Sequence, residues 1–202
     1  EERRHVHLVV DEGFALSCFG AADVVSALDV AHEDDAHVHV VYSASKDLAL
    51  AGYRVGALVS SPAVLRAVSA LGTFCSAGTP AQAIVADLLN DDDWLAKTWI
   101  PALQGRLEAS WQLCRAALDA HGLGLWRGVE PRSGHFCLLD LRDRAKADPA
   151  HLAPAFEEAG VLLTPGPLMG APDGVFRLCH SAAPAADVRE AVRRIDDVLG
   201  RP

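Results

Sequence analysis

Hydrophobic residues in the first third of the chain come in short, nearly continuous runs, a pattern typical of strands buried on both faces. Such runs predict strands over 5–11 (HVHLVVD), 37–43 (HVHVVYS) and 54–60 (RVGALVS). Apolar residues at helical spacing predict a helix over 21–31, and a second helix over 61–72 has proline in its first turn and glycine at its end. Strands alternating with helices indicate an α/β fold with a mixed, mainly parallel sheet.

The pattern changes from about residue 79, where TPAQAIVADLLND is helical. Apolar residues then recur at three- and four-residue steps from Trp94 to His121, and Pro101 predicts a kink or break in that long helix. Strands followed by helices in the rest of the chain indicate an α+β module. We therefore expect two units, 1–100 and 101–202, the second entered through the long helix. The elements expected after that helix are strands over 135–141, 161–165 and 175–181 and helices over 149–160 and 184–200.

Charge and cysteine usage exclude several classes of protein. The 202 residues carry a formal net charge of -9, which argues against nucleic acid as the partner because phosphate binding needs a basic face. The five cysteines are scattered and never spaced as C-x-x-C, which favours the reducing cytoplasm over a disulfide framework or a zinc site. No apolar run reaches about 18 residues, so no membrane span is expected. Histidines alternate on two predicted strands, at 5 and 7 and at 37 and 39, which we interpret as a solvent-facing pattern and not a metal site.

The stretch SASKDLALAGYRVG (43–56) carries the clearest candidate chemistry. Lys46 follows a predicted strand and could form a Schiff base through its amine. The hydroxyls of Ser43 and Ser45 and the guanidinium of Arg54 could bind a phosphate. Asp11, at the end of the first predicted strand, could hold a protonated ring nitrogen. An amine, a carboxylate and phosphate ligands are the groups that a pyridoxal phosphate enzyme needs. Taken singly, these residues also fit a surface lysine, a structural ion pair and a turn cap.

Four segments resemble one known family. S-x-S-K-D-L-x-L-x-G-x-R-V-G at 43–56 resembles the cofactor-lysine signature of the class I/II aminotransferases, which are fold type I pyridoxal phosphate enzymes. HLVVDEGFALSCFG (7–20) resembles the segment with the pyridine-nitrogen aspartate, and VLLTPGPLMGAPDGVFRLCHS (161–181) the region with the carboxylate-binding arginine. SGHFCLLDLR (133–142) is most similar to the 1-aminocyclopropane-1-carboxylate synthase-like branch. The blocks occur in family order, and the likeness covers essentially the whole chain.

The resemblance implies a role for each candidate residue. Lys46 would form the internal aldimine with pyridoxal 5'-phosphate and then shuttle the Cα proton, and Asp11 would pair with the pyridinium nitrogen. Ser43, Ser45 and Arg54 would bind the phosphate. On this resemblance, 1–100 is the C-terminal portion of the cofactor-binding large domain and 101–202 is the small C-terminal domain.

Substrate and partners are also implied by the resemblance. Arg177 would grip the α-carboxylate of an amino acid substrate. Fold type I enzymes build their sites at a dimer interface, so we expect a homodimer or a complementary chain with the N-terminal half. The segment GTFCSAGTPAQ (72–82) lies where the family places an intersubunit loop.

Two departures from the family leave the reaction open. The family's D-E-x-Y is D-E-G-F here, so Phe14 occupies the cofactor-contacting position without the phenol that would reach the cofactor's 3-oxygen. The family's N-terminal half is absent, so the chain is expected to be a fragment or one half of a split enzyme. Three functions remain: aminotransfer, a 1-aminocyclopropane-1-carboxylate synthase-type lyase reaction on S-adenosylmethionine, and a non-catalytic partner of another subunit.

Overall fold

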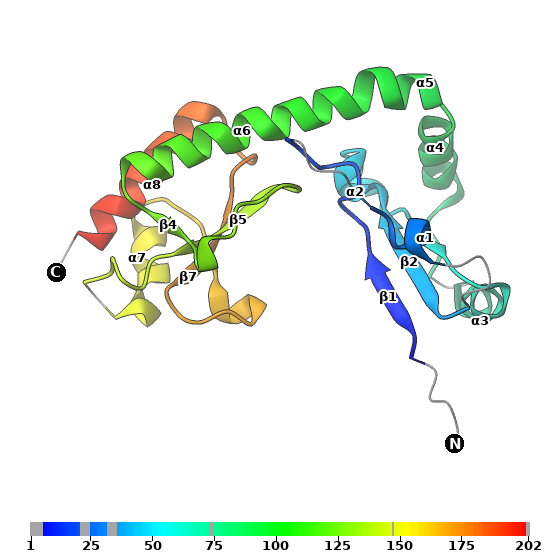
Figure 1. Ribbon diagram of the computed structural model, residues 1–202, viewed down its shortest axis with the longest axis horizontal. Coiled ribbons are helices and arrows are strands. Elements are labelled where there is room, and N and C mark those ends of the chain that lie inside the picture. Colours follow the sequence, from blue (N-terminus) through cyan, green and yellow to red (C-terminus); the bar gives the residue numbers. More distant parts are fainter. Residues whose placement is uncertain (1–5, 21–24, 32–35, 73–74, 147, 201–202) are drawn as a thin grey trace. The chain divides into compact units, whose positions relative to one another are not determined.

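The chain folds as two compact units, residues 1–104 and 105–202, each described below by itself. The computed structural model describes residues 6–20, 25–31, 36–72, 75–146 and 148–200. The division falls within one long helix, α6 (Ile100–Ala120), which Figure 1 shows. Within the described residues, no helix combines the length and the apolar character needed to cross a bilayer.

The first unit is built on a mixed three-stranded sheet in the order β1-β2-β3. β1 and β2 run parallel, with Asp11 opposite Val41, whereas β2 and β3 are antiparallel, with Ser43 opposite Gly56. The continuous Val and Leu runs therefore form strands, each shorter than its run. The expected burial on both faces is not found, because β1 and β3 are mostly exposed among the described residues. The strands are β1 (Leu8–Asp11), β2 (Val38–Ser43) and β3 (Gly56–Val59).

One histidine does not follow the expected solvent-facing pattern. His39 on β2 is buried, and its Nε2 lies 2.7 Å from His7 Nδ1 while its Nδ1 lies 2.6 Å from Ser60 Oγ. Its hydrogen bonds along the sheet allow the imidazole to be buried, because each ring nitrogen has a partner.

Helices flank the sheet, and the first of them is shorter than predicted. In place of a helix over 21–31, the described residues form α1 (Ala27–Val30), because Ser26 caps it. The Ser26 hydroxyl accepts from Leu28 N, and Asp29 accepts from Ser26 N, which is a capping box that fixes the helix start. Residues 21–24 of the predicted helix lie outside the described residues. The other helices of the first unit are α2 (Ala44–Asp47), η1 (Ala51–Tyr53), α3 (Pro62–Gly72), α4 (Thr79–Leu89) and α5 (Asp92–Trp94).

Pro101 produces a π turn and no break in the long helix. The turn η2 (Leu95–Trp99) comes directly before α6, and Ile100 N donates to Leu95 O, five residues back. Proline has no N–H to donate, so the register shift before it lets the helix continue.

The second unit is an α+β module, as expected. Its sheet has the order β4-β5-β7-β6, and every pairing is antiparallel. Phe156 and Phe176 meet edge to face in its core, with ring centroids 5.2 Å apart. The strands are β4 (Gly124–Leu125), β5 (Phe136–Asp140), β6 (Thr164–Pro165) and β7 (Val175–Cys179), and the helical segments after α6 are η3 (Trp126–Gly128), η4 (Pro149–His151), α7 (Leu152–Glu158), η5 (Gly166–Met169) and α8 (Ala185–Leu199).

Candidate functional site

Two parallel strands bring Asp11 and the Lys46 turn to the same edge of the first unit's sheet. β1 ends at Asp11, opposite Val41, and two residues further along β2 the chain turns into α2, of which Lys46 is the third residue. Both Asp11 and Lys46 are exposed to solvent. The carboxyl ends of parallel strands are a common location for binding sites in α/β folds, and here that edge carries one acid and one amine.

Gly13 lies between the Asp11 carboxylate and Ser43. A Cβ added at Gly13 would lie 3.0 Å from Asp11 Oδ1 and 3.5 Å from Ser43 Cβ. The Gly13 N–H donates to Asp11 Oδ1 at 2.9 Å, which holds the carboxylate over this turn. The absence of a side chain at Gly13 therefore lets the two predicted ligands lie near each other.

The predicted phosphate ligands are held by the start of α2 and by the strand next to it. The Ser43 hydroxyl accepts from Ser45 N at 3.2 Å, and Ala44 N donates to Val55 O at 3.2 Å, which fixes the residue after Arg54 beside α2. Arg54 has left-handed backbone angles, and its Nη1 donates to Ala51 O at 3.0 Å. The guanidinium is exposed, so its other N–H groups can meet an anion.

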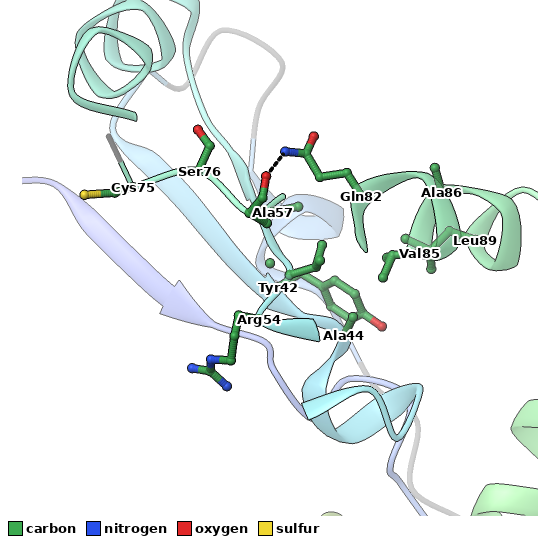
Figure 2. A pocket seen from close by; sticks show the side chains of 13 residues that line it. Tyr42, Ala44, Arg54, Ala57, Cys75, Ser76, Gln82, Val85, Ala86 and Leu89 are labelled. Carbon is green, nitrogen blue, oxygen red and sulfur yellow. Dashed lines mark hydrogen bonds between the residues drawn. The ribbon is translucent and has the colours of Figure 1, made fainter. Parts of the chain in front are cut away.

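Arg54 also lines a pocket of about 470 Å³ beside β2, β3 and α4. Figure 2 shows that its side chain extends away from the Tyr42 ring and from the side chains of α4. The Tyr42 hydroxyl is buried and has no hydrogen-bond partner among the described residues. Burial, and secondarily the negative charge of Asp47, raises the pKa of Tyr42 to about 12, so its phenol stays neutral at physiological pH.

The remaining two predicted residues lie in different places. Phe14 is half-buried in the turn that follows β1, in the first unit. Arg177 is half-buried on β7, in the second unit, where its Nη2 donates to Thr164 Oγ1 at 3.1 Å. The Arg177 guanidinium carbon lies 4.5 Å from the centroid of the Phe136 ring. These contacts orient the guanidinium and leave further N–H groups able to bind a carboxylate.

The groups on the first unit's sheet edge suit one kind of molecule. A primary amine can bond an aldehyde, a carboxylate can hold a protonated ring nitrogen, and hydroxyls with a guanidinium can bind a phosphate. The structure places these groups next to one another. Asp11 and Ser43 lie on either side of Gly13, and Ser43 is the N-cap of α2, which carries Lys46.

The profile of a family described as aminotransferase class I and II matches residues 1–195. The chain belongs to this family. Members of this family depend on pyridoxal phosphate. The prediction from the four sequence blocks is confirmed at the level of the family.

Among curated proteins, the similar relatives of this aminotransferase-family chain include plant 1-aminocyclopropane-1-carboxylate synthases. Synthase 6 of Oryza sativa subsp. japonica is 29% identical over 203 residues, which cover 95% of this chain and 37% of that protein. Synthase 2 of the same source is 31% identical over 206 residues, covering 96% of this chain and 42% of that protein. The chain thus spans less than half the length of these relatives.

Solved structures show the same fold. An aspartate aminotransferase from Thermus thermophilus with maleate superimposes with a TM-score of 0.83 at 25% identity, covering 95% of this chain and 48% of that one. The aromatic aminotransferase from Pyrococcus horikoshii OT3 superimposes with a TM-score of 0.82 at 21% identity, covering 96% and 51%. The chain has the fold of part of a fold type I aminotransferase, as predicted.

The structure adds residues to this aminotransferase-family site that sequence reasoning missed. Asp47, next to Lys46, is fully buried and bonded to the segment after β1. Its sequence signal was an acid within an otherwise small and apolar run. Phe136 and Thr164 contact Arg177, but they come from separate strands, and the sheet register that brings them together is not visible in the sequence.

Proposed function

We propose that the protein containing this chain is a pyridoxal phosphate-dependent enzyme that acts on an α-amino acid through Lys46. The observation that carries the proposal is the arrangement at one sheet edge: Asp11 and Ser43 beside Gly13, with Lys46 on the turn that Ser43 opens. Family membership supports the same cofactor.

Each residue of this edge has a task that its chemistry can perform. Pyridoxal phosphate, when bound, supplies an aldehyde that bonds amines and a ring that withdraws electrons from the substrate's Cα. Lys46 would hold the aldehyde through Nζ and would move the Cα proton of the substrate as its general base and acid. Asp11 would keep a proton on the ring nitrogen. Ser43, Ser45 and Arg54 would donate hydrogen bonds to the phosphate oxygens.

Arg177 of the second unit and Phe14 of the first have separate proposed roles. Arg177 would bind the substrate's α-carboxylate, supported by its contacts with Phe136 and Thr164. Phe14 would contact the cofactor by packing alone, because it has no hydroxyl. The missing hydrogen bond would weaken cofactor binding by about 0.5–1.5 kcal/mol relative to a tyrosine.

We further propose that residues 1–100 are the C-terminal portion of a larger cofactor-binding domain and 101–202 the small domain. The support is the outer side of β1, which is an edge strand among the described residues and exposes 54% of Leu8 and 64% of Val9. An exposed apolar edge strand calls for a covering partner. That partner would be the remaining half of the protein, from the same or a separate chain, within a homodimer or a hetero-assembly. A cytoplasmic location stays a prediction from the cysteine pattern.

The test is to trap the cofactor covalently on its lysine. It uses the full-length protein, or this chain mixed with the polypeptide that supplies the other half. After incubation with pyridoxal phosphate and reduction with borohydride, peptide mapping should find the cofactor on Lys46. Lys97, an exposed lysine paired with Asp93 at 2.7 Å, is the matched control and should stay unlabelled. Labelling spread equally over both lysines, or full activity of Lys46→Ala, would overturn the proposal in favour of a non-catalytic subunit.

A lyase reaction is the second candidate, because the similar curated relatives are synthases of 1-aminocyclopropane-1-carboxylate. Incubation with S-adenosylmethionine that releases methylthioadenosine would establish the lyase reaction. Transfer of the amino group from an amino acid to a keto acid, with S-adenosylmethionine unconsumed, would establish aminotransfer.

A further inference from the structure

A buried carboxylate lies directly beside the exposed Lys46. Asp47 ends the α2 turn and is fully buried, and so is its partner Ser17. Ser17 Oγ donates to Asp47 Oδ1 at 2.5 Å, and Leu16 N donates to Asp47 Oδ2 at 2.9 Å. Both oxygens of the carboxylate are thereby bonded to one segment of chain.

That segment continues directly from Asp11. The turn after β1 is closed by Ala15 N donating to Glu12 O at 3.0 Å and Ser17 N donating to Phe14 O at 3.1 Å. The Asp47 carboxylate therefore connects the turn that carries Lys46 with the turn that follows Asp11.

The position would suit an apolar residue if packing were the whole reason for it. Its neighbours Ala44 and Leu48 belong to a buried hydrophobic cluster with Val85. Burying a carboxylate costs free energy even when it is hydrogen-bonded, and apolar replacements of buried ionic groups are often neutral or stabilising. The charge of Asp47 also acts on this region, since it contributes to the raised pKa of Tyr42.

We infer that Asp47 is a positioning residue of the candidate cofactor site, whose carboxylate fixes the spacing between the Lys46 amine and the Asp11 carboxylate. The inference rests on the proposed function. It assigns to Asp47 no contact with cofactor or substrate: it acts through the two turns that it joins. Lys46 and Asp47 are neighbours in sequence with opposite exposure, one available for chemistry and the other holding the turn in place.

The test uses the exchange of the Cα proton of an α-amino acid for deuterium in D2O, followed by NMR in the full-length, cofactor-loaded protein. This step is common to aminotransfer and to the lyase reaction. Common amino acids and S-adenosylmethionine are first screened, and the compound whose Cα proton exchanges fastest serves as the probe. Asp47→Asn keeps the shape of the side chain but removes its charge and replaces one accepting oxygen by an amide N–H, so the bond to Ser17 Oγ or to Leu16 N is lost or reversed. A small displacement of a reacting group is costly, so we expect kcat for exchange to fall about tenfold or more while KM changes less than about twofold.

Trp99→Phe is the matched control. Trp99 Nε1 donates to the main-chain oxygen of Asp47 at 2.7 Å, so this variant weakens the same turn without changing the carboxylate. It should lower the melting temperature at least as much as Asp47→Asn does, with kcat for exchange within about twofold of the wild type. A purely stabilising Asp47 would make the two variants alike in kcat.

Ser17→Ala keeps the test decisive if Asp47→Asn does not fold. It removes the bond from Ser17 Oγ to Asp47 Oδ1 and should lower kcat about threefold. The double variant Ser17→Ala/Asp47→Asn should be no slower than Asp47→Asn alone, because contacting residues that act as a unit are not additive. Equal kcat in Ser17→Ala and wild type overturns the inference, as does equal kcat in Asp47→Asn and Trp99→Phe. If Lys46→Ala still exchanges the proton at the wild-type rate, the proposed function itself has failed.

Discussion

Replacing Arg177 by lysine tests the substrate-binding role predicted for the second unit. Lysine keeps the positive charge but loses the planar fork that can make two parallel hydrogen bonds to a carboxylate. It also loses the stacking over the Phe136 ring, which the guanidinium carbon approaches to 4.5 Å. One hydrogen bond to a charged group contributes about 1.5 kcal/mol at the low end. The stacking contributes about 0.5–1 kcal/mol at a partly exposed site.

Together these losses come to about 2–2.5 kcal/mol, or about a 30- to 60-fold decrease in kcat/KM, and most of it should appear in KM. The assay is steady-state kinetics of the full-length protein with the amino acid that gives the fastest Cα exchange. Arg142→Lys is the control: Arg142 forms a two-bond pair with Asp140 at 2.8 and 2.6 Å, but it is an exposed ion pair. The reasoning is refuted if Arg177→Lys leaves KM within threefold of the wild type, or if both variants change KM equally.

Three further substitutions or conditions test single contacts. Gly13→Ala places a Cβ 3.0 Å from Asp11 Oδ1, so the carboxylate must shift, and spectrophotometric titration should show the pyridoxal phosphate dissociation constant rising about fivefold. Gly166→Ala places a Cβ against backbone oxygens, including Val175 O at 2.8 Å, and should lower the free energy of unfolding by about 2 kcal/mol or more in urea titrations. Burial, together with His135, lowers the pKa of His180 to about 4, so the folded chain resists its protonation. The unfolded chain binds that proton below about pH 6.5, so acidification from pH 6.5 towards 4 should lower the free energy of unfolding by up to about 3 kcal/mol for this group. In urea titrations at several pH values, His180→Phe should make the unfolding midpoint depend less on pH over this range.

The strands and the residues that end them could be predicted because both signals are local. Near-continuous Val and Leu runs marked β1 and β2. Asp11 is the last residue of β1, and Lys46 comes three residues after the end of β2. Parallel pairing then brings the two ends to the same edge. Ser43, Ser45 and Arg54 were candidates from their residue types within the same short stretch as Lys46, and the family blocks then implied a role for each.

Three expectations from the pattern differ from the structure, two through local hydrogen bonds and one through distant partners. The helix predicted over 21–31 starts late among the described residues because Ser26 and Asp29 cap each other's backbone. Where a kink or break was predicted near Pro101, the helix forms a π turn, because it shifts its bonding register by one residue. His39 was predicted to face solvent, yet partners on both sides of its ring allow it to be buried.

The sequence by itself determined which chemical groups this protein presents and the family to which it belongs, because residue types and spacings in short segments carry that information. Only the tertiary structure decided which of these groups are exposed, which are buried and which contact one another. It exposes Lys46 and buries Asp47, which spacing cannot distinguish, and it sets Phe136 and Thr164 around Arg177 through the register of β5, β6 and β7. The physical reason is that burial and contact depend on residues far apart in the sequence, such as Ser17 and Asp47, which are 30 positions apart and meet only in the folded chain.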